Sequence, residues 1–306
     1  MKVFSGSANF PLAQKIAQYL GETVSPRELF VFPDGERRVQ IQENVVDEDT
    51  VVVQPTATPV DSNYMELFFL CDSLKRSGAR SVTAVVPYLG YQRQDHVFRD
   101  GEAVSLAVIV KMLESIGVDR VISCDLHSIK IPEFFTIPMT HLSALPLFAH
   151  TIREENLLKN SVLISPDMGG IRRIKQMSEM LDGLPYAVLE KDRNLDTGNV
   201  AIVRIEGEVA KRALIVDDMI SSGGTIVKAA DFLRQRGVEE IVIFVTHAVF
   251  SKEAPKLLQE SLITKVYVTD SVYVSEEKRF AKLEILSLAD MMATSLRDHE
   301  VTKQSF

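Results

Sequence analysis

Two adjacent carboxylates beside a loop of small residues form the most informative stretch of this sequence. An apolar run at positions 213–216 precedes Asp217 and Asp218, and the loop that follows is Ser221-Ser222-Gly223-Gly224-Thr225. Small residues let backbone N–H groups approach a phosphate, and the start of the next helix adds its positive dipole end. The acids suit sugar hydroxyls, which donate hydrogen bonds, or a metal ion. The stretch therefore predicts a site for a sugar phosphate, and the alternative is an ordinary polar turn before a helix.

A parallel sheet must position this stretch, because ligands bind at the carboxyl ends of the strands of an open parallel sheet. The sequence indicates a strand–loop–helix–strand unit twice, at 51–55, 64–76 and 82–87 and again at 213–216, 226–236 and 241–245. We interpret the repeat as two related α/β domains, with coincidence among common βαβ units as the alternative. Only the second copy carries the acids and the Gly-Gly-Thr sequence. The first copy is therefore expected to serve another purpose, such as holding a second substrate.

The composition is that of a globular protein with about two domains. The chain has 306 residues, of which 46% are hydrophobic, enough for a substantial core in each domain. Its net charge of −8 argues against a general nucleic-acid binder, whose affinity comes from neutralising phosphates with Lys and Arg. The N-terminus has no apolar signal segment, and the longest apolar stretches are about half of what a membrane span needs. We therefore expect neither a nucleic acid nor a membrane as a partner.

The cysteine content bears on the compartment. The two cysteines, Cys71 and Cys124, both lie among apolar residues. Two cysteines are too few for the usual structural zinc site, and thiols in an apolar setting indicate a reduced protein with buried cysteines. We therefore expect a cytoplasmic location.

Three further segments of the N-terminal half carry polar side chains in a turn or near the end of a predicted strand. The sequence Phe32-Pro33-Asp34-Gly35-Glu36 indicates a tight turn between two strands, which by itself is an ordinary hairpin. Arg93, Gln94 and Asp95 follow a predicted strand. Because a guanidinium matches phosphate oxygens two at a time, this segment could clamp a triphosphate, or it could be a solvated loop. His127, near the end of another apolar strand, could contact a phosphate or Mg²⁺, or it could be a satisfied core histidine.

The C-terminal half adds an acid beside a second glycine-rich turn. Asp167 follows a predicted strand at 161–164 and precedes two glycines that open a helix. Its place at the carboxyl end of a strand is the place where ligands bind in such sheets. The basic residues of the following helix, Arg172, Arg173 and Lys175, are expected on a solvated face rather than at an effector site.

Two cations lie at the base of a polar hairpin. Lys191 and Arg193 end a strand that starts at Tyr186, and a second strand is predicted at 199–205. An exposed hairpin of this kind could be a solubilising loop. It could also be a lid that brings positive charge onto a reacting phosphate and excludes water.

Together these motifs resemble those of the ribose-phosphate pyrophosphokinases, also called phosphoribosyl pyrophosphate synthetases. The 213–225 stretch resembles the phosphoribosyl-binding loop of type I phosphoribosyltransferases, and the hairpin turn matches the Phe-x-Asp-Gly-Glu loop of the pyrophosphokinases. Positions 91–95 are similar to the family's Tyr-Ala-Arg-Gln-Asp motif, with Gln92 in place of Ala. Asp-Leu-His at 125–127, Ser-Pro-Asp-x-Gly-Gly at 165–170 and the Lys-x-Arg pair of the flap also match.

The resemblance implies an α/β fold of two tandem type I phosphoribosyltransferase-like domains, each with a central, mostly parallel sheet flanked by helices. The expected domains are residues 1–143, on the ATP side, and residues 144–306, which carry the ribose 5-phosphate loop and the catalytic flap. The last helix is a candidate to pack back on the N-terminal domain. The family also implies a homo-oligomer, based on dimers and reaching up to a hexamer, with active sites near subunit interfaces.

The resemblance also implies a role for each motif. The ATP side comprises Phe32, Asp34, Glu36, Arg93, Gln94, Asp95 and His127. The ribose 5-phosphate side comprises Asp217, Asp218, Ser221, Ser222, Gly223, Gly224 and Thr225. His127 and Asp167 would organise Mg²⁺, which is the implied cofactor. Lys191 and Arg193 would neutralise charge on the transferring group.

The implied reaction is diphosphoryl transfer from ATP to the 1-hydroxyl of ribose 5-phosphate, which yields 5-phosphoribosyl 1-pyrophosphate and AMP for nucleotide biosynthesis. One alternative is a phosphoribosyltransferase, which the duplicated domain and the Phe-x-Asp-Gly-Glu loop argue against. The other is a non-catalytic regulatory relative, which the retained flap cations and ribose-loop acids argue against. The short flap, the Ser221-Ser222-Gly223 loop and the altered C-terminal tail indicate a divergent subgroup.

Overall fold

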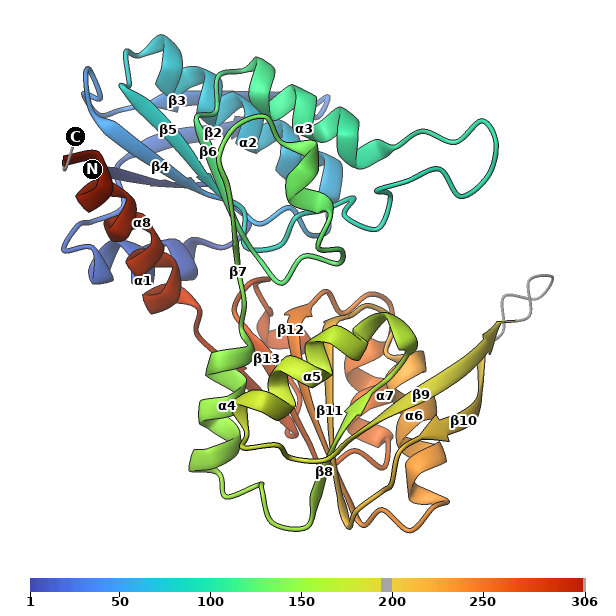
Figure 1. Cartoon of the computed structure of the whole chain (residues 1–306). Helices are drawn as coiled ribbons and strands as arrows, with labels where there is room; N and C mark the ends of the chain where they lie inside the picture. The colour runs from blue at the N-terminus through green and yellow to red at the C-terminus, as the bar shows by residue number, and fades with distance from the viewer. Residues whose placement is uncertain (194–199, 305–306) are drawn as a thin grey trace. The chain divides into compact units, whose positions relative to one another are not determined.

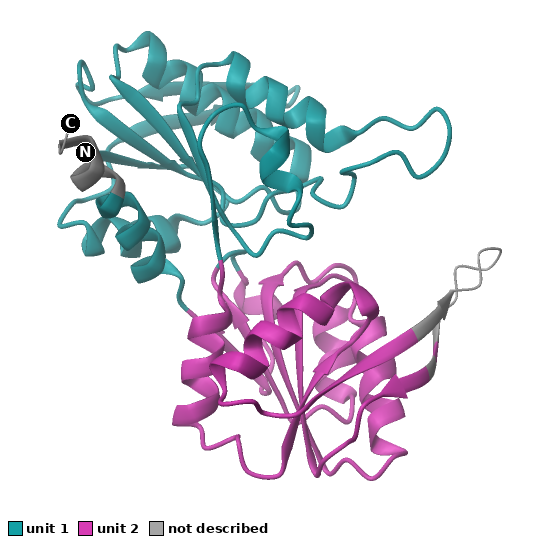
Figure 2. Cartoon of the chain, in the orientation of Figure 1, with its two compact units in different colours: residues 1–142, 271–273, 287–306 teal, residues 143–270, 274–286 magenta. Residues whose placement is uncertain are grey.

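The computed structural model describes residues 1–193 and 200–304. These residues form two compact α/β units (Figures 1 and 2). Unit 1 comprises Met1–Leu142, Ser271–Tyr273 and Ser287–Phe306, and unit 2 comprises Ser143–Asp270 and Val274–Leu286. Each unit has its own sheet and its own buried apolar core.

Unit 1 is built on a parallel sheet of five strands in the order β1-β4-β5-β6-β7. The strands are β1 (Lys2–Ser5), β4 (Asp49–Val53), β5 (Ser81–Val85), β6 (Arg120–Cys124) and β7 (Met139–Leu142). The flanking helices are α1 (Phe10–Tyr19), α2 (Val60–Arg76), α3 (Ser105–Ser115) and the short η1 (Ile131–Phe134). Strands β1, β4 and β6 are almost continuously buried, as expected of parallel strands covered on both faces.

A separate hairpin and the last helix complete unit 1. Strands β2 (Arg27–Val31) and β3 (Arg37–Ile41) pair antiparallel as a two-stranded sheet of their own. Helix α8 (Ala289–Gln304) packs beside α1. Arg120, at the start of β6, donates a hydrogen bond to Ser295 Oγ of this helix at 3.3 Å. The end of the chain therefore belongs to the unit in which the chain begins.

Unit 2 is built on a seven-stranded sheet in the order β10-β9-β8-β11-β12-β13-β14, in which only β9 and β10 pair antiparallel. The strands are β8 (Ser161–Ser165), β9 (Tyr186–Arg193), β10 (Val200–Glu206), β11 (Arg212–Ile220), β12 (Glu240–Ala248), β13 (Lys265–Thr269) and β14 (Leu283–Leu286). The helices are α4 (Leu145–Glu154), α5 (Ile171–Met180), α6 (Gly224–Arg234), α7 (Ala254–Glu260), η2 (Met168–Gly170) and η3 (Glu276–Lys278). In the parts of both units that the structure describes, no helix is both long and apolar enough to cross a bilayer.

The two units repeat one topology, which confirms the predicted fold class. The strand order β1-β4-β5-β6-β7 of unit 1 corresponds to β8-β11-β12-β13-β14 of unit 2. The predicted repeat is present as β4-α2-β5 and β11-α6-β12. Each unit also carries a hairpin between its first two sheet strands, β2–β3 in one and β9–β10 in the other. The hairpins differ in support, because β9 pairs with β8 of the main sheet whereas β2 and β3 pair only with each other.

The strand that carries the acids is longer than predicted. Strand β11 runs to Ile220 rather than ending at Val216, so Asp217 and Asp218 lie on the strand and not in the loop. The reason is pairing, because β12 also continues to Ala248 and faces Asp217 with Val245. Helix α6 in turn begins at Gly224, two residues before the predicted start.

Candidate active site

The predicted sugar-phosphate loop joins β11 to α6. Gly223 adopts the left-handed conformation (φ 78°), which glycine reaches without strain, and it directly precedes the first helical residue, Gly224. No side chain described in the structure caps this end of the helix. Ser221, Gly224 and Thr225 are half-buried, whereas Ser222 is exposed. The loop therefore combines backbone N–H groups at a helix start with three hydroxyls, which is the chemistry that a phosphate requires.

The neighbouring strand holds this loop in place. Phe250 N–H donates to the Ile220 carbonyl at 3.1 Å, and Ser251 N–H donates to the Ser221 carbonyl at 3.0 Å. The hydroxyls of Ser221 and Ser251 are also 3.0 Å apart. These bonds extend the β11–β12 pairing past the ends of both strands, so the loop starts from a fixed position.

Arg173 of α5 contacts both acids of β11. Its Nη1 lies 3.2 Å from Asp217 Oδ1, and its Nη2 lies 3.8 Å from Asp218 Oδ1. Asp217 Oδ1 also accepts the backbone N–H of Asp218 at 2.9 Å. Asp218 is buried and Asp217 half-buried. The acids therefore form an ion-paired cluster at the carboxyl edge of the sheet.

This contact corrects the expectation that the basic residues of α5 lie on a solvated face. Arg172 and Lys175 are exposed as expected, but Arg173 is not. Successive helical residues are about 100° apart, so Arg173 adjoins the buried Ile174 on the helix surface, whereas Arg172 lies on the far side. The orientation of α5 on the sheet therefore places Arg173 at the site and leaves Arg172 in solvent.

The acid cluster carries more negative charge than Arg173 offsets. Burial raises the pKa of Asp217 well above its usual value, and the neighbouring Asp218 charge raises it further. Arg173 lowers this pKa, while the more distant Asp167 adds to the rise. A ligand that donates hydrogen bonds or carries positive charge would therefore bind here favourably.

Replacing Arg173 with alanine is expected to destabilise the ligand-free protein by about 1–3 kcal/mol at pH 8, because it removes a cation that contacts both acids. Without Arg173 the folded-state pKa of Asp217 rises further. The loss of stability should therefore shrink as the pH falls to 5 and protonation relieves the repulsion. Thermal unfolding at both pH values measures this. The exposed Arg172→Ala is the matched control, and equal losses for the two variants would contradict the assignment.

Asp167 lies on the same edge of the sheet. It follows β8, the strand that pairs with β11, and caps the short helix η2 by accepting the Gly170 N–H at 3.3 Å. Its carbonyl accepts the Ser165 hydroxyl at 2.7 Å. A Cβ on Gly170 would lie 2.4 Å from that hydroxyl, so only glycine fits the turn. The structure therefore brings Asp167 and the two β11 acids to one edge.

The flap cations lie at the end of β9. The backbone of Lys191 pairs with Ile202 of β10, and that of Arg193 pairs with Val200. The strand therefore continues through both cations before the flap turns. The tip of the flap, residues 194–199, and the side chains of Lys191 and Arg193 lie outside the described part of the chain.

In unit 1, Gln92 joins two of the predicted ATP-binding segments. Its Oε1 accepts the backbone N–H of His127 at 2.9 Å. Gln92 is buried, and its Nε2 has no hydrogen-bond partner among the residues that the structure describes. The exposed Arg93 and Gln94 follow directly. The sequence marked Gln92 only as a replacement for Ala, and the long-range bond to His127 is what assigns it to the site.

The turn before Gln92 is held against α2. Thr56 Oγ1 accepts the Gly90 N–H at 2.8 Å, and the Tyr64 hydroxyl donates to the Gly90 carbonyl at 2.8 Å. A Cβ on Gly90 would lie 2.5 Å from the Thr56 carbonyl, so this close approach requires glycine. The segment that carries Arg93 therefore starts from a rigid base.

The predicted adenine loop is the exposed tip of the β2–β3 hairpin. Phe32 N–H donates to the Glu36 carbonyl at 2.8 Å and closes the turn, while Asp34 accepts the Glu36 N–H at 3.1 Å. Gly35 has a φ of 93°, which favours glycine. The Phe32 ring packs edge-on against Phe30 with centroids 4.9 Å apart. The tip therefore offers an aromatic ring and two exposed carboxylates to a ligand.

Comparison with known proteins identifies the family. Residues 1–117 match the N-terminal domain of ribose phosphate pyrophosphokinase, and residues 189–305 match the phosphoribosyl synthetase-associated domain. The ribose-phosphate pyrophosphokinase of Gloeobacter violaceus is 40% identical over 302 residues, which are 98% of this chain and 90% of that protein. This chain belongs to the ribose-phosphate pyrophosphokinase family.

Other relatives agree with this assignment. The ribose-phosphate pyrophosphokinase of Haemophilus influenzae is 39% identical over 301 residues, covering 97% of this chain and 95% of that protein. The crystal structure of phosphoribosylpyrophosphate synthetase from Mycobacterium smegmatis matches with a TM-score of 0.91 at 33% identity, covering 98% of this chain and 99% of that one. The predicted family and fold are thereby confirmed. The roles of single residues within the ribose-phosphate pyrophosphokinase site stay predictions.

Proposed function

We propose that this chain catalyses transfer of the β,γ-diphosphoryl group of ATP to the 1-hydroxyl of ribose 5-phosphate. The ribose oxygen attacks the β-phosphorus, the bond from that phosphorus to the α-phosphate oxygen breaks, and AMP leaves. The hydroxyl proton is released, and the product is 5-phosphoribosyl 1-pyrophosphate. The observation that carries the proposal is the acid pair and phosphate loop at the β11–α6 junction of a chain that belongs to the ribose-phosphate pyrophosphokinase family over nearly its whole length.

In this proposal, unit 2 holds the acceptor. The residues of the β11–α6 loop, Ser221 to Thr225, bind the 5-phosphate through backbone N–H groups and hydroxyls. Asp217 and Asp218 accept hydrogen bonds from the ribose hydroxyls. Binding at both ends of the sugar orients the 1-hydroxyl, and orientation of the reactants is a large part of phosphoryl-transfer catalysis.

Unit 1 holds the donor. Phe32 stacks on the adenine, and Asp34 and Glu36 accept hydrogen bonds from its amino group. Arg93 and Gln94 bind the phosphates. Asp95, the next residue of the same segment, belongs to the ATP side of the site. His127, bonded through its backbone to Gln92, contacts a phosphate or a metal-bound water.

The donor set fits Mg²⁺, which prefers oxygen ligands. Asp167 supplies a carboxylate, and the acids of β11 add negative charge to the same edge of unit 2, where Arg173 contacts both of them. No group of three or more His, Cys, Asp or Glu side chains in the described ranges forms a ready-made metal site. Asp167 is the residue of unit 2 that would hold Mg²⁺ together with substrate phosphates, and His127 is the residue of unit 1 that would contact a phosphate or a metal-bound water. When bound, Mg²⁺ would neutralise charge on the diphosphoryl group.

Lys191 and Arg193 complete the site. The transferring group carries its charge on oxygens that are not bonded to the ribose or to AMP, and cations that close over them stabilise that charge. A hairpin that extends the main sheet suits this task, because β9 pairs with β8 on one side and β10 on the other.

AMP formation from MgATP, measured with and without ribose 5-phosphate, tests the function. We expect one AMP for each 5-phosphoribosyl 1-pyrophosphate, identified by mass, and no AMP without the sugar. Release of ADP would indicate an ordinary sugar kinase. Absence of any product from the folded protein, with phosphate and Mg²⁺ varied, would favour a regulatory relative.

Two further properties belong to the proposal. We infer a homo-oligomer, dimer-based and reaching up to a hexamer, and the exposed Phe30, Val31 and Phe32 of the hairpin support an intersubunit role for this element. Light scattering after size-exclusion chromatography measures the assembly. A reducing compartment such as the cytoplasm suits Cys71 and Cys124, since neither forms a disulfide and burial raises the pKa of Cys71 to about 12.

A further inference from the structure

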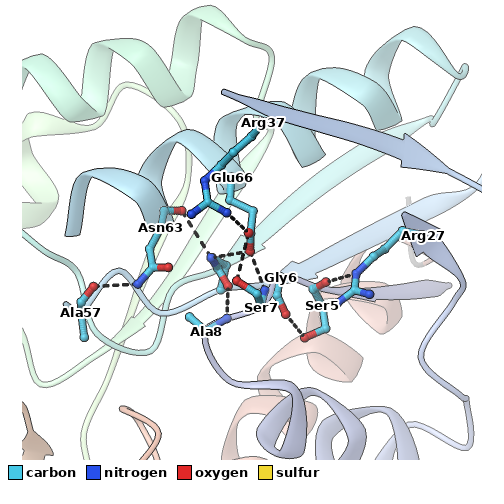
Figure 3. Close-up of polar contacts among 10 residues, drawn as sticks. Ser5, Gly6, Ser7, Ala8, Arg27, Arg37, Ala57, Asn63 and Glu66 are labelled. Carbon is cyan, nitrogen blue, oxygen red and sulfur yellow. Dashed lines mark hydrogen bonds and ion pairs between the residues drawn. The ribbon is translucent and has the colours of Figure 1, made fainter. Parts of the chain in front are cut away.

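A buried carboxylate on α2 is the centre of a polar network at the carboxyl edge of the unit 1 sheet (Figure 3). Glu66 is 1% exposed and accepts four hydrogen bonds. Its Oε1 accepts Ser7 N–H at 2.5 Å and Gln54 Nε2 at 3.0 Å. Its Oε2 accepts the Ser7 hydroxyl at 2.9 Å and Arg37 Nη1 at 2.9 Å. The carboxylate therefore bonds at once to the loop after β1, to the residue that follows β4 and to the hairpin.

Arg37 is the hairpin's contribution to this network. It is the first residue of β3 and directly follows Glu36 of the predicted adenine loop. Its backbone pairs with Val31, the residue that precedes Phe32. A bond from the Arg37 side chain to α2 therefore acts at the base of the tip that carries Phe32, Asp34 and Glu36.

The hairpin depends on such side-chain bonds more than its counterpart does. The β9–β10 hairpin of unit 2 continues the main sheet through β8, whereas β2 and β3 form a sheet of their own. The inner face of the β2–β3 hairpin packs Leu29, Val39 and Ile41 on the core of unit 1. Apolar packing is not directional. The position and orientation of the hairpin tip on the core of unit 1 therefore depend on directional hydrogen bonds.

A second arginine attaches the other strand to the end of β1, directly before the same loop. Arg27, the first residue of β2, donates from Nε to the Ser5 carbonyl at 2.7 Å (Figure 3). Gly6 fits beside Gln54 only because it has no side chain, since a Cβ there would lie 2.1 Å from Gln54 Oε1. Gln54 Oε1 in turn accepts the Ala8 N–H at 3.1 Å. The end of β1 therefore holds β2, and the loop that follows β1 shares the Glu66 carboxylate with β3.

We propose that the ion pair between Arg37 and Glu66 positions the hairpin tip for ATP, so that both residues are positioning residues for nucleotide affinity. The pair joins the tip to the carboxyl edge of the sheet, where the Arg93 segment also begins. The hydrogen bond joins two charged groups and is partly buried. The Arg37 side chain is 23% exposed and the Glu66 side chain 2% exposed. This inference rests on the proposed function, because it assumes that the tip binds adenine.

Arg37→Ala is the test variant, because Glu66 keeps its other three hydrogen bonds and the variant should fold. Arg38→Ala is the matched control. Arg38 is the next residue of the same strand, is exposed, and pairs with Glu28 inside the hairpin rather than with the body of the unit. Arg37→Lys keeps the charge without the planar fork and should give an intermediate result. Glu66→Gln, which keeps the shape and removes the charge, is the second variant.

Two measurements on the full chain test the anchoring of the hairpin tip and its effect on ATP affinity separately. In hydrogen exchange, the amides of residues 29–36 should exchange faster in Arg37→Ala, with unchanged exchange in the β4 and β5 strands. In equilibrium binding and kinetics, Kd and KM for ATP should rise by about tenfold, while kcat and KM for ribose 5-phosphate stay within about twofold of wild type. Arg38→Ala, which removes a contact to the Phe30 ring but keeps the bond from the hairpin to α2, should change both measurements much less than Arg37→Ala.

Unchanged exchange of residues 29–36 in Arg37→Ala would overturn the anchoring. Faster exchange with unchanged Kd for ATP would overturn the link to nucleotide affinity. Equal effects of Arg37→Ala and Arg38→Ala would also overturn it, because any loss of charge would then suffice. These outcomes are distinct from failure of the proposed function, in which the wild-type protein itself makes no AMP from MgATP and ribose 5-phosphate.

Discussion

Lys191→Ala is expected to lower kcat by about 10³-fold or more while leaving the Kd for ATP nearly unchanged. The reason is that a cation acting on the transferring group stabilises charge that is redistributed only in the transition state, so its removal affects the chemical step more than binding. Lys191 occupies one of the last positions of β9 before the flap turns. Single-turnover AMP formation, with ATP binding measured by calorimetry, tests both halves of the prediction.

Lys211→Ala is the control for the flap variant. Lys211 directly precedes β11, is exposed, and pairs with Glu239 at the end of the sheet opposite the phosphate loop. Its replacement removes the same charge from unit 2 and should leave kcat unchanged. Near-normal kcat in Lys191→Ala would contradict a role for Lys191 in the chemical step.

Asp217→Asn is expected to have two opposite effects. It should lower kcat/KM for ribose 5-phosphate by about 10–100-fold, because a charged acceptor of a sugar hydroxyl is lost. It should also raise the melting temperature of the ligand-free protein at neutral pH, because burial and the adjacent Asp218 make the Asp217 charge unfavourable in the folded state. The Asp217 charge would then lower the stability of the ligand-free protein while it strengthens the binding of ribose 5-phosphate.

The pH dependence gives the sign of the second effect. The folded-state pKa of Asp217 is raised above the unfolded value, which is about 3.9, so the folded state holds this proton more tightly. The penalty is therefore absent below the unfolded pKa and grows as the pH rises toward the folded pKa. The gain in melting temperature from Asp217→Asn should be larger at pH 8 than at pH 4.

Thermal unfolding of Asp217→Asn and Asp231→Asn at pH 4 and pH 8 measures this difference. Asp231 is exposed on α6, so its replacement removes one negative charge from the same unit without touching the acid cluster. A lower melting temperature for Asp217→Asn at pH 8, or an equal gain at both pH values, would contradict the electrostatic account of the site.

Local sequence patterns predicted most of the elements and the chemistry expected at the main site. Short apolar runs bounded by polar turns predicted strands such as β8 and β13, because buried parallel strands carry no polar alternation. The acids and small residues of the β11–α6 junction predicted a sugar-phosphate site, because that chemistry depends on neighbours in the sequence. Boundaries were less certain, and β11 extends past its predicted end because β12 supplies backbone partners for it.

Contacts between residues far apart in the chain could not be predicted in this way. Arg173 reaches Asp217 across 44 positions, and it does so because β8 and β11 are neighbours and α5 packs with Ile174 inward. Gln92 reaches His127 across 35 positions. Each of these side chains has an ordinary solvated interpretation until the order of the strands is known.

Glu66 and Arg37 also show the difference between what the sequence predicts and what the tertiary structure decides. In the sequence, Glu66 is one acid on a helix and Arg37 is one of two adjacent arginines on a strand. Residue types and spacing predicted the sugar-phosphate site, and the resemblance to the family implied the nucleotide site. Burial decided which charged residues support those sites, because a charge taken out of water must find its partners in the fold, and the partners of Glu66 come from three separate segments.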